Sequence, residues 1–199
     1  MAGFMLAAET GNTRLLLACA AAAPLVRETG FALPAALLLT GQVPRGLLAA
    51  VPGAAWTGLV LSYYPLQGQS KEFGFLPLEW FRRVSTPREV EDAAVQWVVR
   101  GLDVLALAAL AVLALWAVRV AWPVRRTAPA AAALVFLAGG MTLGGPNVMS
   151  DPYHWGRVQS PWMVWMLLES VVQRRWGAVA AVAAISLTPL AYSAKNIMR

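Results

Sequence analysis

The chain has 199 residues, of which 59% are hydrophobic and only 13% are charged. This balance excludes an ordinary soluble globular domain. The formal net charge of +6 would suggest a nucleic-acid partner in a soluble protein. Here the arginines stand in short loops between apolar segments, so membrane topology explains them better and no nucleic acid is expected.

The apolar segments are rich in Ala, Gly and Leu, which favours helices over the alternating pattern of a membrane β-barrel. We therefore predict an all-α, polytopic membrane bundle that forms a single transmembrane domain over residues 1–199, with about six or seven membrane-inserted segments. No internal repeat of solenoid period is evident. Cys19, the single cysteine, lies in an apolar run and is predicted to be a small packing residue.

The first elements are short. Residues 1–8 are apolar but too short to span a membrane, and they look like the end of a helix whose beginning is missing. Two apolar arms, residues 15–26 and 31–40, flank the sequence RETG and predict a short hairpin over residues 15–40. Each arm is shorter than the roughly 20 residues that a span needs. Arg27 and Glu28 are therefore predicted to lie below the outer membrane surface.

Longer segments follow the hairpin. Residues 46–65 predict a span that Pro52 and Gly53 are expected to kink. In the sequence LEWFRRV, residues 78–84, apolar and basic side chains separate onto two helix faces, which is typical of a helix that lies in the membrane interface. Further helices are predicted over residues 93–122, 129–143, from the 144–157 loop to about Val172, and 177–192.

The arginines in the turns predict the orientation. If they all face the cytoplasm, the intervening segments alternate across the membrane without contradiction. The residues concerned are Arg14, Arg45, Arg125, Arg126, Arg174 and Arg175. The tip of the hairpin and the loops 66–92 and 144–157 are then outward-facing.

The first candidate site is the hairpin tip. An arginine sunken in the membrane costs roughly 2.5–3.5 kcal/mol unless it faces a cavity, a partner or an anionic ligand. Arg27 and Glu28 are therefore candidates for binding a lipid phosphate or a sugar. The alternative is that Arg27 pairs with Glu28 or with a neighbouring helix and only fixes the packing.

The second candidate site is the sequence SDPYHWGRVQSPW, residues 150–162. Asp151 before a proline is typical of a helix start, and His154 and Arg157 then fall on one helix face. A cation beside a positive helix N-terminus suits a phosphate, so Asp151, Tyr153, His154 and Arg157 are candidates for the same lipid phosphate or sugar. The alternative is that Asp151 only caps the helix, Tyr153 anchors it at the interface, and His154 is solvated. One His and one Asp do not make a metal site, and none is expected.

Several of these segments together resemble the polytopic glycosyltransferases of the C superfamily, which take sugars from polyprenyl phosphates outside the cytoplasmic membrane. In that family a short apolar helix ends in a basic motif, and an apolar helix, a basic turn and a helix with Pro and Trp follow. The same order is found here in LVRETG (residues 25–30), PAALLL, PRG and VPGAAW (residues 51–56). YHWGRVQSPW also resembles the Tyr- and Arg-containing start of a late helix in bacterial members. The likeness covers most of the chain.

The resemblance implies a multi-pass protein of the cytoplasmic (inner) membrane that handles a polyprenyl-phosphate-linked sugar in cell-envelope glycan synthesis, without a cofactor. Arg27 and Arg157 would hold the phosphate, and the 66–92 loop would cover the site. The family's catalytic acid lies in a large outer loop that should precede RETG, and this sequence has no such loop. We therefore expect the C-terminal part of such an enzyme, with its N-terminal half or a partner subunit elsewhere and its catalytic residue unknown. The alternative is a non-enzymatic membrane subunit or transporter-like module whose buried charges are structural.

Overall fold

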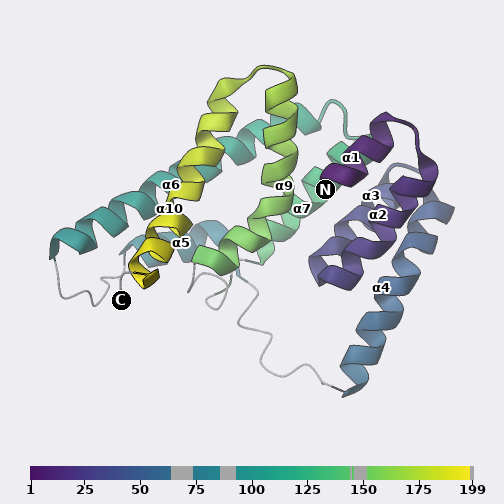
Figure 1. The fold of residues 1–199 in the computed structure, drawn as a ribbon, viewed down its shortest axis with the longest axis horizontal. Helices are drawn as coiled ribbons and strands as arrows, with labels where there is room; N and C mark the ends of the chain where they lie inside the picture. The colour runs from purple at the N-terminus through teal and green to yellow at the C-terminus, as the bar shows by residue number, and fades with distance from the viewer. Residues whose placement is uncertain (64–73, 86–92, 144, 146–151, 198–199) are drawn as a thin grey trace. The chain divides into compact units, whose positions relative to one another are not determined.

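The computed structural model describes residues 1–63, 74–85, 93–143, 145 and 152–197. Every regular element within these ranges is helical, which confirms the predicted all-α class. The elements are α1 (Ala2–Glu9), α2 (Thr13–Val26), the 3-10 helix η1 (Glu28–Phe31), α3 (Ala32–Leu39), α4 (Val43–Tyr63), α5 (Leu76–Ser85), α6 (Ala93–Ala121), α7 (Ala128–Thr142), α9 (Pro152–Val172) and α10 (Trp176–Ile197), as labelled in Figure 1.

The chain divides into two compact units. Unit 1 comprises Met1–Gln69 and Ala117–Gly139, and unit 2 comprises Ser70–Trp116 and Gly140–Arg199. The predicted hairpin is present in unit 1 as α2, η1 and α3, and the predicted amphipathic segment is helix α5 of unit 2. Helix α9 begins at Pro152, as the Asp151-Pro152 pair predicted, because a proline at the first helical position loses no hydrogen bond. Residues 152–157 of the predicted loop 144–157 are therefore helical.

Two helical segments are long and apolar enough to cross a membrane, namely Val43–Tyr63 and Arg100–Ala121. Only 17% and 33% of their most apolar stretches are buried, whereas the core helix of a soluble protein would be mostly buried. Large apolar side chains such as Leu48 and Leu115 are instead exposed. These helices support membrane association, and the count of six or seven inserted segments stays a prediction.

Unit 1 is built around the packing of α2 against α1, α3 and α4, and of α3 against α4. Small residues allow the close approach of these helices. Gly46 of α4 lies against the side chain of Leu38, and Gly3 of α1 lies against Sγ of Cys19. The latter contact agrees with the predicted packing role of the cysteine. Leu37 and Phe4 fill the interior of the unit.

Unit 1 contains a structural repeat of 30 residues that was not predicted. Helices α1 and α3 begin at Ala2 and Ala32 and end at Glu9 and Leu39, and the following helices α2 and α4 begin at Thr13 and Val43. A Thr-Gly turn joins each pair. In both turns the threonine hydroxyl donates to the carbonyl four residues earlier, at 2.8 Å, and the glycine has a positive φ, 65° at Gly11 and 81° at Gly41.

The backbone hydrogen bonds of the two Thr-Gly turns are also equivalent. Asn12 and Gln42 donate N–H to the carbonyls of Ala7 and Leu37, at 2.9 and 2.8 Å. The two glycines donate to Ala8 and Leu38. This is the Schellman arrangement, in which two free carbonyls at a helix end are satisfied by the residues that leave the helix.

The same closure ends α9 in unit 2, where Arg175 N–H donates to Ser170 at 2.7 Å and Arg174 N–H donates to Val171 at 3.1 Å. Here the left-handed position is occupied by Arg174, with φ 55°. The chain then enters α10, which packs against α9 as an antiparallel neighbour (Figure 1). A non-glycine residue in this conformation is strained by contact of Cβ with its own backbone.

We predict that Arg174→Gly raises the free energy of unfolding by up to about 1 kcal/mol, because relief of the left-handed strain exceeds the added entropy of the unfolded chain. The matched control is Arg175→Gly, which removes the same charge from a residue without positive φ and should lower stability. Unfolding in a denaturing detergent, followed by tryptophan fluorescence, measures both. Equal destabilisation by the two variants would contradict the prediction.

Candidate functional site at the α2–α3 turn

The backbone at the end of α2 positions Arg27. Pro24 occupies the last turn of the helix, and it cannot donate a hydrogen bond to the preceding turn. Arg27 then leaves the helix with extended backbone, φ −161° and ψ 142°. Its N–H still donates to Ala23 at 3.1 Å, and its carbonyl accepts from Gly30 N–H at 2.8 Å. The arginine is thus fixed between the end of α2 and the start of η1.

Two glycines make this turn possible. Gly30 is buried, and a Cβ at this position would overlap the carbonyl group of Ala23 and the nitrogen of Pro24. Gly53 of α4 lies in the same way against the ring of Pro24, and a Cβ there would stand 3.0 Å from Cζ of Phe31. Gly30 thus lets η1 return onto the backbone at the end of α2, and Gly53 lets α4 lie against the side chains of Pro24 and Phe31. These contacts bring α2, η1 and α4 together in unit 1 next to the turn that holds Arg27.

The charges at the turn are only loosely paired. Arg27 Nε lies 3.9 Å from Glu28 Oε1, and the side chains are 28% and 77% exposed. A single long contact to an exposed carboxylate contributes little to stability. Among the described residues this is the one ionic contact of Arg27. Its terminal guanidinium nitrogens are therefore available as hydrogen-bond donors for an anion.

The surroundings of the turn are apolar. Leu25 and Val26, the residues before Arg27, are 46% and 86% exposed. An arginine beside exposed aliphatic side chains suits a ligand that carries a negative charge next to a hydrocarbon chain. Arg27 also stands at the C-terminal end of α2, where the helix dipole favours a cation. The apolar neighbours suit the predicted ligand-binding role, and the position at the helix end suits the alternative of a structural charge.

The second candidate site lies mostly outside the described residues. This holds for Asp151, and for the side chains of Tyr153, His154 and Arg157. The backbone of the last three belongs to α9, whose start at Pro152 confirms the predicted helix start. Arg27 belongs to unit 1 and Arg157 to unit 2, so a shared role for these two arginines stays a prediction.

The described part of the same segment contains a buried polar contact that was not predicted. Gln159 is 1% exposed and joins α9 to the end of α7 within unit 2. Its Nε2 donates to the carbonyl of Gly140 at 2.9 Å, and its Oε1 accepts from Trp162 Nε1 at 2.7 Å. Gly140 lies so close to the amide that a Cβ would stand 2.5 Å from Oε1. Gln159 stands between Val158 and Ser160, two residues after Arg157, so no local sequence signal predicted its burial; only the Gly139-Gly140 pair indicated a close approach in this part of the chain.

Neither a metal centre nor a related protein identifies the function. The described residues contain no group of three or more His, Cys, Asp or Glu side chains that could hold a metal ion. Comparison of the chain with protein-family models, with curated proteins and with solved structures finds no match.

We predict that Gly30→Ala and Gly53→Ala each lower the free energy of unfolding by about 1–3 kcal/mol, because the added methyl group overlaps backbone atoms at Gly30 and the Pro24 ring at Gly53. The matched control is Gly58→Ala in α4, where a Cβ meets nothing within 4 Å and the higher helix propensity of alanine should stabilise the protein slightly. Thermal unfolding of the three variants compares them directly. A Gly30 variant as stable as the Gly58 variant would show that the turn is looser than described.

We further predict that Gln159→Leu destabilises unit 2 by about 1–3 kcal/mol for each group that it leaves without a hydrogen bond, namely the Gly140 carbonyl and the Trp162 indole N–H. Gln173→Leu is the control, since that side chain is exposed and bonds to Glu169 at the surface. Unfolding monitored by tryptophan fluorescence measures the loss. Similar stabilities of the two variants would contradict a role for the buried amide.

Proposed function

We propose that this protein is a polytopic, glycosyltransferase-like protein of the cytoplasmic membrane that binds a polyprenyl-phosphate-linked sugar for cell-envelope glycan synthesis. The observation that carries the proposal is the position of Arg27 at the α2–α3 turn. The guanidinium is held by a defined backbone turn, has only a long contact to an exposed glutamate, and follows two exposed aliphatic residues. The polyprenyl phosphate offers the matching pair of chemical groups, an anion and a hydrocarbon chain.

Two further observations support a membrane location. The apolar surfaces of α4 and α6 are mostly exposed, and burying such surfaces in lipid removes them from water. The described helices also include shorter apolar segments, such as residues 13–26 and 128–142, which have the composition of inserted segments but less than the length of a full span. They agree with the proposal of several inserted segments beyond the two long ones.

The role of Arg27 in the proposed reaction is to hold the phosphate. In inverting transfer from a polyprenyl-phosphate sugar, the acceptor attacks the sugar carbon and the bond to the phosphate oxygen breaks. The leaving phosphate gains negative charge, and a guanidinium beside it stabilises that charge in the transition state. A carboxylate must remove the proton of the acceptor. We assign no residue to this step.

A structural role is the second candidate, and the position of Arg27 at the end of α2 favours it. A cation at this end of the helix compensates the partial negative charge of the last carbonyls, and Glu28 lies within ion-pair distance. In a non-enzymatic membrane subunit or transporter-like module, these contacts alone would account for both charges.

The two candidates are separated by the variants Arg27→Ala, Arg27→Lys and Glu28→Gln. If Arg27 binds the lipid phosphate, Arg27→Ala should weaken binding of a polyprenyl-phosphate sugar at least tenfold, which corresponds to about 1.5–3 kcal/mol for a charged hydrogen bond. Arg27→Lys should retain part of the binding, because the cation remains. Glu28→Gln should strengthen binding, since it removes a competing anion.

Binding is measured by titrating the full chain in detergent with the lipid-linked sugar, and thermal unfolding is recorded for every variant. Arg157→Ala belongs to the same series and tests the second predicted phosphate ligand. Unchanged binding in Arg27→Ala together with lowered stability would refute the phosphate role and establish the structural one.

A further inference from the structure

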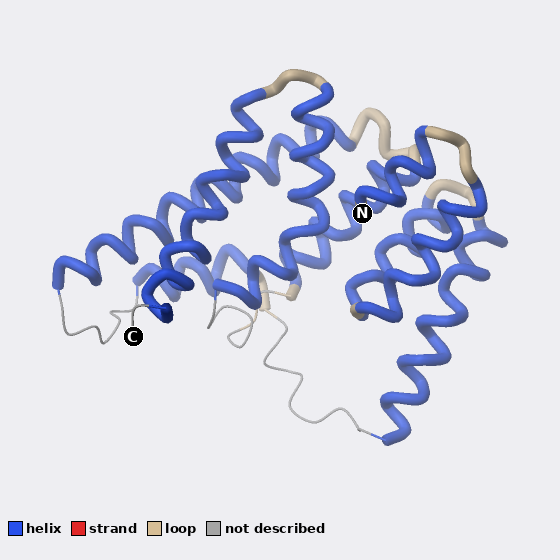
Figure 2. Tube along the Cα trace, in the orientation of Figure 1, coloured by secondary structure: helices blue, strands red, loops and turns tan. Residues whose placement is uncertain are grey.

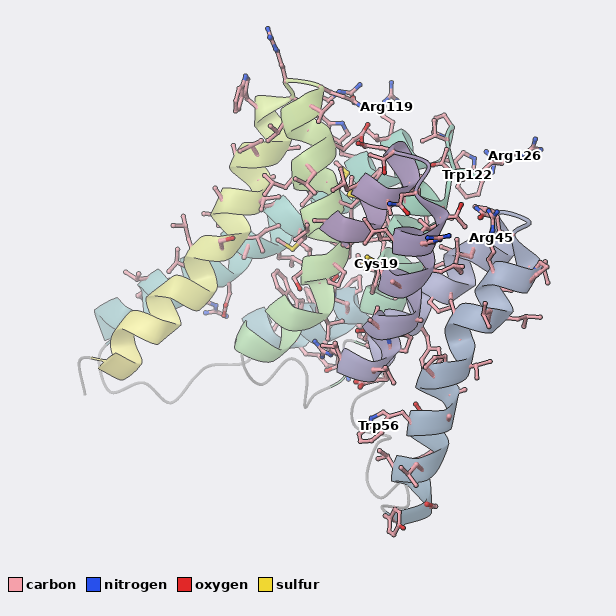
Figure 3. All side chains as sticks on the ribbon, turned by 45° about the vertical axis from the view of Figure 1, so that its right-hand side comes forward. Cys19, Arg45, Trp56, Arg119, Trp122 and Arg126 are labelled. Carbon is pink, nitrogen blue, oxygen red and sulfur yellow. The ribbon has the colours of Figure 1, made fainter. Side chains whose placement is uncertain are left out.

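The 30-residue repeat places two arginines at the same end of unit 1. Arg14 and Arg45 each follow one of the equivalent Thr-Gly turns, in the first turn of α2 and of α4. The α6–α7 turn, residues 122–127, lies at this end as well (Figure 2). The labelled side chains of Arg45, Arg119, Trp122 and Arg126 lie toward this end (Figure 3). We call this surface, formed by the two Thr-Gly turns with the first turns of α2 and α4 and by residues 119–127, the turn face of unit 1.

Charge is distributed very unequally between the two ends of unit 1. Among the described residues of the unit, the turn face carries five arginines and one glutamate, Glu9, a net charge of +4. The arginines are Arg14, Arg45, Arg119, Arg125 and Arg126. The α2–α3 turn carries the unit's remaining charged side chains, Arg27 and Glu28, which cancel.

The turn-face arginines are exposed and are not neutralised by described residues. All five are exposed, and none forms an ion pair within the described part of the chain. Arg45 donates to Gln42 Oε1 at 2.8 Å. Arg125 donates to the carbonyl of Trp122 at 2.8 Å and lies 4.7 Å from the centre of its ring. Both neutral contacts preserve the positive charge and leave further N–H donors for a ligand.

Apolar side chains border the same arginines. Trp122 is 57% exposed, and Val43, Leu47 and Leu48 of α4 are 48% to 63% exposed. A nucleic acid or an acidic peptide would complement the positive charge alone. A phospholipid complements both parts, because its anionic headgroup matches the arginines and its acyl chains match the aliphatic and indole side chains.

We propose that the turn face of unit 1 binds the headgroups of anionic phospholipids, whose acyl chains cover the exposed apolar residues at the start of α4. This site is distinct from the α2–α3 turn and does not depend on the proposed function of Arg27. Each guanidinium contributes attraction to the negative headgroups, and the contributions of neighbouring arginines combine. Trp122 and Arg125 together form an amphipathic anchor at the boundary between headgroup and hydrocarbon.

In the experiment, the full chain in detergent is incubated with an equimolar mixture of phosphatidylglycerol and phosphatidylcholine that have identical acyl chains. Native mass spectrometry then measures the ratio of the two lipids that stay bound. We expect enrichment of phosphatidylglycerol in the unaltered protein. The variant Arg125→Gln/Arg126→Gln should reduce the enrichment by about fivefold for each arginine removed, and rising salt should reduce it as well.

The matched control is Arg174→Gln/Arg175→Gln, which removes two exposed arginines from a turn of unit 2 and should leave the enrichment nearly unchanged. If Arg125→Gln/Arg126→Gln does not fold, Arg14→Gln/Arg45→Gln tests the same surface from the repeated turns. Equal losses in the unit 1 and unit 2 variants would show that only the overall charge matters and would overturn the site. The absence of any preference for phosphatidylglycerol in the unaltered protein would overturn it as well.

Discussion

Unit 1 depends on close contacts that only glycine allows, at Gly30 against backbone and at Gly53 against the Pro24 ring. At Gly30 the chain returns directly onto the carbonyl group of Ala23, and at Gly53 helix α4 lies on the ring of Pro24. These contacts determine the direction of the chain after α2, and therefore where Arg27 and Glu28 stand. Close packing of this kind stabilises helices even where the surroundings are apolar and the hydrophobic effect between helices is weak. The same principle recurs in unit 2, where Gly140 admits the amide of Gln159.

The separation of charge from apolar surface follows from this compact arrangement. In unit 1 the described charges occupy the two ends of the helices, while the sides of α4 expose leucine, valine and tryptophan. Moving a charge into hydrocarbon is costly, and moving an aliphatic side chain into water is also unfavourable. A lipid bilayer would satisfy both requirements if the charged helix ends stood in the headgroup regions and the apolar side of α4 faced the hydrocarbon. The two proposals use opposite ends of this unit, one for a lipid-linked sugar and the other for anionic headgroups.

The helices themselves were largely predictable from the sequence. Apolar runs bounded by Gly, Pro, Asn and Arg predicted the positions of α4, α6, α7 and α10, and the RETG break between two short arms predicted the hairpin. Pro152 predicted the start of α9, although the predicted loop 144–157 included the first six residues of this helix. Local signals were sufficient in these cases because helix ends are determined mainly by residues close in sequence.

The contacts between helices were not predictable in the same way. Nothing in the sequence near Gly30 indicates that Ala23 will lie against it, since this depends on how far the chain turns. Gln159 was missed because glutamine is usually exposed, and only its partner Gly140 explains its burial. The repeat in unit 1 was missed because LAAETGN and ALLLTGQ share only the adjacent Thr and Gly, while the hydrogen bonds that make them equivalent involve the backbone.

The Thr-Gly turns have a consequence for the synthesis of the protein. Every hydrogen bond that closes the first turn joins residues between Leu6 and Asn12, and every bond that closes the second joins residues between Ala36 and Gln42. Each turn can therefore form as soon as its own short segment has left the ribosome, before later helices exist. In a nascent chain, such turns join the helices of each pair with the carbonyl groups at the bend already satisfied.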